Sequence, residues 1–408
     1  MKKKINRDFS SFRDPAGYIY YSDNKVFRKI NPCYFKQYNY LNDSKLYTVL
    51  TELGYLIPHK EIISNNKEIV LEVEKIPFIS YPYEWCFNEL KDAALLTLKI
   101  CRKALEYDMI LKDASSYNIQ FYKGRPIFID TLSFDFYEEG SPWGGYGQFC
   151  RHFIAPLLLM SCVDENLNCI LKNYIDGIPI DVANNILNGR GGFTARQHIK
   201  WHSKSISKNN DNKELKKVFV SKKSLFNMID MMIRQIEKLK TKKVLTEWET
   251  YYHNTNYSDV ADRIKGELVE KYLKKISITE NDVIFDLGAN DGKYSRLASN
   301  LGANVISFDI DINAVSNNYF NIKKNNEEKI LPLILDCTNP SPDLGFALEE
   351  RLGINKRGNR KAVMALAFIH HMAISNNVSF DMIANWFSKL GEYLIIEFVP
   401  KDDSQVKK

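Results

Sequence analysis

The amino-acid sequence predicts an α/β protein of two domains, in which a parallel sheet at the C-terminal end follows an α+β domain. Between residues 283 and 398, five short apolar runs alternate with helical stretches, as in parallel strands joined by helical crossovers. The first 200 residues lack that alternation and combine strand-like runs with an amphipathic helix over residues 87–107. A chain of 408 residues is long enough to form two such cores.

The domain boundary is expected in a polar, basic stretch. Residues 1–200 should form the first domain, residues 201–245 a basic linker with a connector helix, and residues 246–408 the second domain. Lysine and arginine far outnumber acidic residues between Arg196 and Lys243, which would suit an anionic partner. A solvated linker is the simpler interpretation, and nucleic acid is not an expected partner.

The cysteines and the apolar runs bear on the compartment. The seven cysteines include no Cys-x-x-Cys pair, which favours free thiols in a reducing cytoplasm. No window reaches the roughly 20 apolar residues that a membrane span requires. The N-terminus is basic, but no apolar signal core follows it. We therefore expect a cytoplasmic protein with no membrane span.

The first C-terminal strand leads into a tight turn with the spacing Asp286-x-Gly288-x-Asn290-x-Gly292. Glycine allows unusual backbone dihedrals and a close approach of a ligand, and asparagine tolerates left-handed geometry better than most residues. A strand, such a turn, a helix and a second strand that ends in an acid suit a nucleoside-type cofactor. The Gly-x-Gly-x-x-Gly spacing of an NAD site is absent.

This arrangement resembles the first motif of the class I S-adenosyl-L-methionine (SAM)-dependent methyltransferases, so the C-terminal domain is expected to be Rossmann-like and to bind SAM. The resemblance implies that Asp286 accepts a hydrogen bond from the ammonium group of the cofactor's methionine part. Asp309 would accept the ribose hydroxyls, with Asp311 as the competing choice. Asp336, after the third strand, would lie near the adenine amino group.

The fourth strand runs into His370 and His371, at the position that faces the methyl group in that family. Imidazole titrates near neutral pH, so either histidine is a candidate general base, and Glu397 on the fifth strand is a second candidate. The pair could instead begin a helix with one ring buried. We expect no metal site, because adjacent residues rarely point at one ion. Aromatic residues precede the first strand, where the family often has a lid: Trp248, Tyr251, Tyr252 and Tyr257.

The five strands match the first five of the seven in the methyltransferase sheet. The family normally adds a helix and an antiparallel strand pair, for which no sequence remains after the fifth strand. Either this version of the domain is truncated or its sheet is finished differently, and an unfinished sheet edge would be open to pairing with another chain.

The N-terminal domain contains the spacing Asp113-x4-Asn118-x11-Asp130. This resembles the catalytic loop and metal-binding aspartate of protein kinases and small-molecule phosphotransferases. The resemblance implies Asp113 as the base and Asn118 and Asp130 as ligands of Mg²⁺, with Mg-ATP as a second cofactor.

The N-terminal domain also departs from the kinase pattern. It has no glycine-rich phosphate loop. Either Arg28 or Lys29 would have to take the place of the nucleotide-binding lysine. Glu52, on a helix over residues 44–54, is expected to face Lys29. The alternative is a substrate-recognition domain in which Asp113 and Asn118 order a turn.

The order of motifs along nearly the whole chain is similar to bacterial methyltransferases of a nodulation-protein type. The resemblance implies methyl transfer from SAM to an oxygen or nitrogen acceptor on a small molecule or saccharide. A bifunctional kinase–methyltransferase is one alternative. A catalytically silent binding module with a methyltransferase-like shell is another. The oligomeric state is not predicted.

Overall fold

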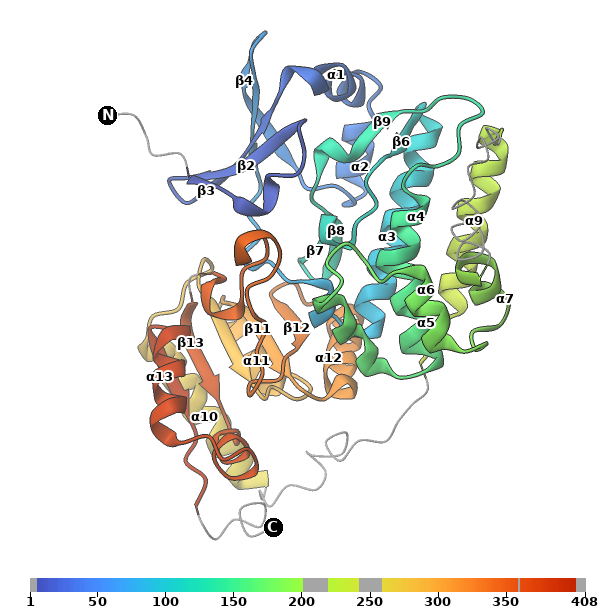
Figure 1. The fold of residues 1–408 in the computed structure, drawn as a ribbon. Helices are drawn as coiled ribbons and strands as arrows, with labels where there is room; N and C mark the ends of the chain where they lie inside the picture. Colours follow the sequence, from blue (N-terminus) through green and yellow to red (C-terminus); the bar gives the residue numbers. More distant parts are fainter. Residues whose placement is uncertain (1–5, 201–218, 242–258, 359, 401–408) are drawn as a thin grey trace.

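The N-terminal part begins with an antiparallel sheet. The computed structural model describes residues 6–200, 219–241, 259–358 and 360–400 (Figure 1). The sheet order is β1-β2-β3-β5-β4. Asp23 and Asn24 turn the β2–β3 hairpin with positive φ angles of 50° and 62°, as a tight hairpin turn requires. The strands are β1 (Asn6–Arg7), β2 (Gly17–Ser22), β3 (Lys25–Ile30), β4 (His59–Ser64) and β5 (Ile69–Val73).

A mainly helical layer packs beneath this sheet around the long helix α3 (Phe87–Glu106). The Cys86 N–H donates to the Glu89 carboxylate at 2.8 Å and so caps the start of α3. The other helices are α1 (Phe35–Asp43), α2 (Leu46–Glu52), α4 (Tyr146–Phe149), α5 (Ala155–Cys162), α6 (Ile180–Leu187) and α7 (Gly192–Ala195). Two short antiparallel pairs complete this part: β6 (Met109–Leu111) with β9 (Phe134–Phe136), and β7 (Ile119–Tyr122) with β8 (Arg125–Phe128).

The expected connector helix is α9 (Lys222–Lys238), which packs along α3. Leu225 and Ile229 on its apolar stripe are buried in the N-terminal core, and Arg102 of α3 forms an ion pair with Asp230 at 2.8 Å. Residues 201–218 and 242–245 of the expected linker, and the four candidate lid aromatics, lie outside the described residues.

The C-terminal part contains a parallel sheet with the order β12-β11-β10-β13-β14, so the strand order reverses between β10 and β13. The predicted α/β fold class, with a Rossmann-like C-terminal sheet, is confirmed. The strands are β10 (Val283–Leu287), β11 (Asn304–Asp309), β12 (Ile330–Ile334), β13 (Arg360–Ala365) and β14 (Tyr393–Ile396). The helices are α10 (Asp259–Lys275), α11 (Lys293–Asn300), α12 (Ile312–Asn325) and α13 (Phe380–Leu390).

The two faces of the parallel sheet enter different cores. Ile284 and Val305 pack against α10 and α11 in a small core on one face. Phe285 and Phe308 point to the other face and join the core of the N-terminal part. The Phe78 ring, from the segment before α3, packs edge-on against both, with ring centroids 5.6 and 6.3 Å apart. The N-terminal part thus covers this face of the C-terminal sheet at β10 and β11, and α13 packs on the same face at β13.

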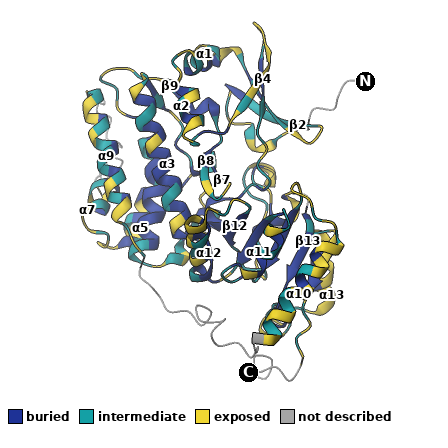
Figure 2. Cartoon of the chain, turned by 180° about the vertical axis from the view of Figure 1, so that it is seen from behind, coloured by how far each residue is buried: buried dark blue, intermediate teal, exposed yellow. Residues whose placement is uncertain are grey.

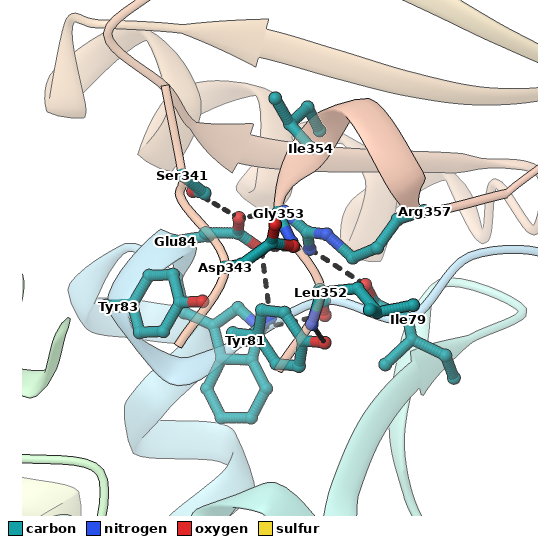
Figure 3. A network of polar contacts seen from close by, with 12 residues as sticks. Ile79, Tyr81, Tyr83, Glu84, Ser341, Asp343, Leu352, Gly353, Ile354 and Arg357 are labelled. Atoms are coloured by element: carbon teal, nitrogen blue, oxygen red, sulfur yellow. Dashed lines mark hydrogen bonds and ion pairs between the residues drawn. The ribbon is translucent and has the colours of Figure 1, made fainter. Parts of the chain in front are cut away.

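A buried ion pair joins the two parts (Figure 3). Glu84 precedes α3, and Arg357 lies in the connector between β12 and β13; their side chains are 0% and 3% exposed. Ser341, also in the connector, donates its hydroxyl to Glu84 at 2.6 Å, and Arg357 donates to the Ile79 carbonyl at 2.9 Å. A charge pair without water needs these extra hydrogen bonds to offset its desolvation.

None of the helices in the described ranges is long and apolar enough to cross a membrane.

Candidate functional site

Three predicted carboxylates lie at the carboxyl ends of three adjacent strands. In the strand register, Asp286 lies beside Ser307, and Asp309 lies beside Ile334, two residues before Asp336. Burial is the main cause that raises the pKa of both Asp286 and Cys337. The Asp309 charge adds to the rise at Asp286, and the charges of Asp309 and Asp336 add to the rise at Cys337, so these groups lie close together. The three acids therefore share one edge of the sheet, next to the reversal of strand order where open α/β sheets bind ligands.

Asp286 is buried, with 2% of its surface exposed. The Ser295 hydroxyl, from the first turns of α11, donates to its carboxylate at 2.6 Å. Burial, with a smaller effect of the Asp309 charge, raises the pKa of Asp286 to about 7, although the Ser295 hydrogen bond opposes this shift. Asp286 is thus a carboxylate whose ionised form would be stabilised by a cation.

The turn after β10 has the left-handed backbone that its sequence predicts. Gly288, Asn290 and Gly292 have φ angles of 72°, 50° and 81°. A Cβ atom at Gly288 would lie 2.6 Å from the ring of Phe368, and one at Gly292 would lie 2.5 Å from the Asn318 amide. The turn therefore needs glycine at both places, for backbone geometry and for space.

Asp309 binds the turn to the end of β11. One carboxylate oxygen accepts the Asn290 N–H at 2.7 Å, and the other accepts the Asp311 N–H at 2.9 Å. Burial raises the pKa of Asp309 to about 6. Each oxygen has a second lone pair for a ligand hydroxyl. Asp311 instead caps α12, where it accepts the Asn313 N–H at 2.8 Å.

Asp336 lies two residues beyond β12 and is partly exposed. One of its oxygens accepts both the N–H and the hydroxyl of Thr338, at 2.8 and 2.7 Å. This local turn holds the carboxyl group beside Cys337 at the same edge as Asp309.

The two candidate histidines follow β13. Their ring centroids are 3.9 Å apart, and His370 is 8% exposed. Burial, together with the neighbouring His370, lowers the pKa of His371 to about 4. His371 is therefore neutral at pH 7 and is able to accept a proton, but a group with so low a pKa is a weak general base.

Glu397, the other candidate base, is paired with Lys265 of α10 at 2.7 Å, and the two side chains are 19% and 14% exposed. The Lys265 ammonium lies 4.7 Å from the centroid of the Tyr294 ring. Asp262, also on α10, accepts the Tyr294 hydroxyl at 3.1 Å and forms an ion pair with Lys293. These contacts hold the N-terminal half of α10 beside the carboxyl ends of β10 and β14, while Val269 and Leu273 pack on the face of the sheet.

Sequence reasoning missed the residues that support the site: Ser295, Phe368, Lys265 and Asp262. Serine inside a helix and lysine on an amphipathic one are too common to stand out. One available signal was that Ser295 lies nine positions after Asp286 in the strand–turn–helix unit, one turn into its helix.

The structure brings the N-terminal candidates together as well. Arg28 of β3 forms an ion pair with Asp130, which also accepts the Ser133 hydroxyl. Asn118 donates to Ser133 at 3.3 Å, and Asp113 accepts the Ser115 N–H at 3.0 Å. Burial, and then the Asp130 charge, raise the pKa of Asp113.

One expectation for this domain is wrong. Lys29 pairs with Glu68, the residue before β5, at 2.7 Å, and Glu52 is exposed, so Glu52 does not face Lys29. Adjacent residues of a strand point to opposite faces, and it is Arg28 that points toward Asp130. Within the described ranges, no three His, Cys, Asp or Glu side chains gather where they could hold a metal ion.

No protein-family model matches the chain. Among solved structures, vaccinia related kinase 3 is similar over 57% of this chain and 85% of its own, with 12% identity and a TM-score of 0.29. Coclaurine N-methyltransferase, bound to N-methylheliamine and SAH, is similar over 53% of this chain and 58% of its own, with 10% identity and a TM-score of 0.26. At these scores the fold class rests on the strand order alone.

One curated relative matches nearly the whole chain. Nodulation protein NoeA from Rhizobium meliloti (strain 1021) is 31% identical over 414 residues, which cover 98% of this chain and 86% of that protein. The resemblance to proteins of a nodulation-protein type is thereby confirmed. The chain belongs to the family of nodulation protein NoeA.

Proposed function

We propose that this protein is a SAM-dependent methyltransferase that transfers a methyl group to an oxygen or nitrogen atom of a small molecule or saccharide. The observation that carries the proposal is the convergence of three carboxylates at the ends of β10, β11 and β12. They lie beside the reversal of strand order and next to a turn that glycine keeps open.

Each carboxylate has a distinct proposed role. SAM supplies an electrophilic methyl group on its sulfonium. Asp286, buried and held by Ser295, would accept the ammonium of the methionine part. Asp309 would accept the ribose hydroxyls, because both of its oxygens are oriented by backbone N–H groups. Asp336 would accept from the adenine amino group.

The acceptor would be positioned rather than strongly activated. His371 has a pKa of about 4, and Glu397 is neutralised by Lys265, so neither is a strong base in the unliganded protein. Methyl transfer from a sulfonium depends chiefly on alignment of the nucleophile with the methyl group. His370 and His371 would then help to shape the acceptor pocket at the end of β13.

Titration calorimetry with SAM tests the cofactor site. Asp309→Asn should weaken SAM binding by about 1–3 kcal/mol, because a charged acceptor for two hydroxyls is lost. Asp311→Asn is the matched control, since asparagine is an equally good helix cap and should leave the affinity unchanged. If Asp311→Asn weakens SAM binding and Asp309→Asn does not, Asp311 and not Asp309 accepts the ribose hydroxyls. No SAM binding, with salt-sensitive binding of a polyanion, would favour the silent binding module.

The assembled Asp113, Asn118 and Asp130 cluster supports a second candidate, a bifunctional kinase–methyltransferase. Asp130 would have to exchange Arg28 for Mg²⁺ before it could act. This candidate predicts a rise in melting temperature with Mg-ATP that Asp130→Asn abolishes. No rise in the unmodified protein would retire it.

A further inference from the structure

Lys265 of α10 lies at the carboxyl edge of the sheet, between the ends of β10 and β14. Its ammonium is 2.7 Å from the Glu397 carboxylate and 4.7 Å from the centroid of the Tyr294 ring. Tyr294 precedes Ser295, whose hydroxyl binds Asp286 at the end of β10. Figure 2 shows α10 beside the buried strands of this sheet. One lysine therefore connects the proposed cofactor site with the end of β14.

The charge of Lys265 also acts on Asp286. Burial raises the pKa of Asp286, and the Ser295 hydrogen bond and then the Lys265 charge oppose that rise. Neighbouring strands are about 4.8 Å apart, so β14 lies roughly 10 Å from β10, with β13 between them. An ammonium that contacts Glu397 and acts on Asp286 lies between these two carboxylates, over the end of β13.

The methionine part of SAM needs such a cation. It carries an ammonium and a carboxylate on the same carbon atom, so a carboxylate must accompany the ammonium into the site. If Asp286 accepts the ammonium, the ligand carboxylate lies close to Asp286 as well. Like charges that are sheltered from water repel one another strongly, and a cation is needed to offset that repulsion. Lys265 is in the position to supply it.

Glu397 holds the place of a ligand carboxylate in the unliganded protein. Its backbone N–H donates to the Ala365 carbonyl at 3.2 Å, so Glu397 directly follows the last pairing of β14 with β13. Its side chain contacts Lys265, and the two side chains are 19% and 14% exposed. An ammonium with so little exposure needs an anionic partner, and Glu397 is one.

We propose that Lys265 binds the carboxylate of SAM and that SAM thereby displaces Glu397 from Lys265. This inference rests on the proposed function. The displaced Glu397 carboxylate would stay beside the end of β13, where His370 and His371 shape the acceptor pocket. A hydroxyl or amine of the acceptor would then find a carboxylate to accept its hydrogen bond only after SAM has bound. The exchange would make acceptor binding follow cofactor binding.

Titration calorimetry with two ligands tests the role of Lys265. Decarboxylated SAM keeps the ammonium and lacks the carboxylate. Lys265→Met should weaken binding of SAM on the order of 10-fold and should not weaken binding of decarboxylated SAM, because the lost partner is the carboxylate. Lys265→Arg, which keeps the charge, should retain SAM binding.

Lys293→Met is the matched control for Lys265→Met. The Lys293 ammonium lies 5.7 Å from the centroid of the same Tyr294 ring, and it has its own acid in Asp262. This substitution should leave the affinity for both ligands unchanged. If Lys293→Met weakens SAM binding and Lys265→Met does not, the carboxylate partner is Lys293 and the proposal is wrong.

Glu397→Gln should have the opposite effect on SAM. Loss of the competing carboxylate should tighten SAM binding by about fivefold, the size of one partly exposed ion pair, and should not tighten binding of decarboxylated SAM. Glu392→Gln is the control, because Glu392 lies just before β14 and pairs with Lys361 at 3.0 Å. It should leave SAM affinity unchanged. Glu397→Gln also tests the exchange if Lys265→Met fails to fold.

The signs of these changes separate exchange from a structural role. If the Lys265–Glu397 pair only holds α10 in place, both substitutions should weaken both ligands, and that result would overturn the proposal. Weaker SAM binding by Glu397→Gln alone would mean that the pair stays intact in the complex, which also overturns it. If the intact chain binds neither ligand, the proposed function itself fails and this inference fails with it.

Discussion

At the scale of single residues, Asp286 links cofactor binding to pH. Burial raises its pKa from 3.8 to about 7, so the unliganded fold holds a proton on Asp286 below pH 7. An ammonium ligand stabilises the carboxylate and expels that proton. SAM affinity should therefore rise with pH by up to about tenfold per unit between pH 5 and 7, and then level off.

The same shift has the opposite sign for folding. A carboxyl group with a raised pKa stabilises the unliganded protein at acid pH, and this contribution is lost as pH rises from 3.8 toward about 7.

Titration calorimetry of SAM binding, in buffers with different ionisation enthalpies, would measure the proton that Asp286 releases when SAM binds. Asp286→Asn should remove the proton release, and a release that persists in this variant would assign it to another group.

At the scale of elements, the turn after β10 should not tolerate a side chain. Gly288→Ala adds a methyl group 2.6 Å from Phe368 at a φ of 72°, whereas Gly189→Ala meets no atom within 4 Å at a φ of 83°. Left-handed backbone alone costs about 1 kcal/mol for alanine, so Gly189→Ala should lose that much and Gly288→Ala about 2 kcal/mol or more. Chemical denaturation would measure both, and equal losses would mean that Phe368 moves aside.

The elements also show what sequence can and cannot predict. The strand from Val283 and the helix from Lys222 follow from apolar periodicity, which is a local property of the chain. The left-handed Asn290 follows from turn chemistry. The choice between Arg28 and Lys29 depends on which face of β3 meets the rest of the domain, and local sequence does not encode that.

The candidate site divides in the same way. The three acids were predictable, because strand ends place them in order along one edge. The Lys265–Glu397 pair was not, because it joins α10 to the end of β14 through tertiary packing. That pair makes Glu397 a weaker candidate base than its position in the sequence suggests.

At the scale of the whole molecule, the Glu84–Arg357 pair joins the two parts of the chain. Glu84→Gln would leave a buried guanidinium without its partner charge and should lower the free energy of unfolding by about 3–5 kcal/mol. Lys25→Gln, at a pair whose side chains are 56% and 33% exposed, should cost at most about 1 kcal/mol. Urea denaturation compares the two, and similar small losses would mean that water reaches Glu84.

The shared core implies that the C-terminal sheet depends on the N-terminal part. Phe285 and Phe308 pack against Phe78, so a fragment of residues 246–408 would expose one apolar face of its sheet. We expect that fragment to aggregate or to remain unfolded, as judged by its solubility and far-ultraviolet circular dichroism. A folded, monomeric fragment would show that the N-terminal part is an independent addition.

If Asp286, Asp309 and Asp336 form one nucleoside-binding edge, a crystal structure of the intact chain with S-adenosylhomocysteine will show the ligand there. The ribose should lie within hydrogen-bonding distance of Asp309, the amino-acid part should lie near Asp286, and the adenine should lie beside Asp336. A nucleoside bound elsewhere, with this edge empty, would mean that the three carboxylates do not form the cofactor site.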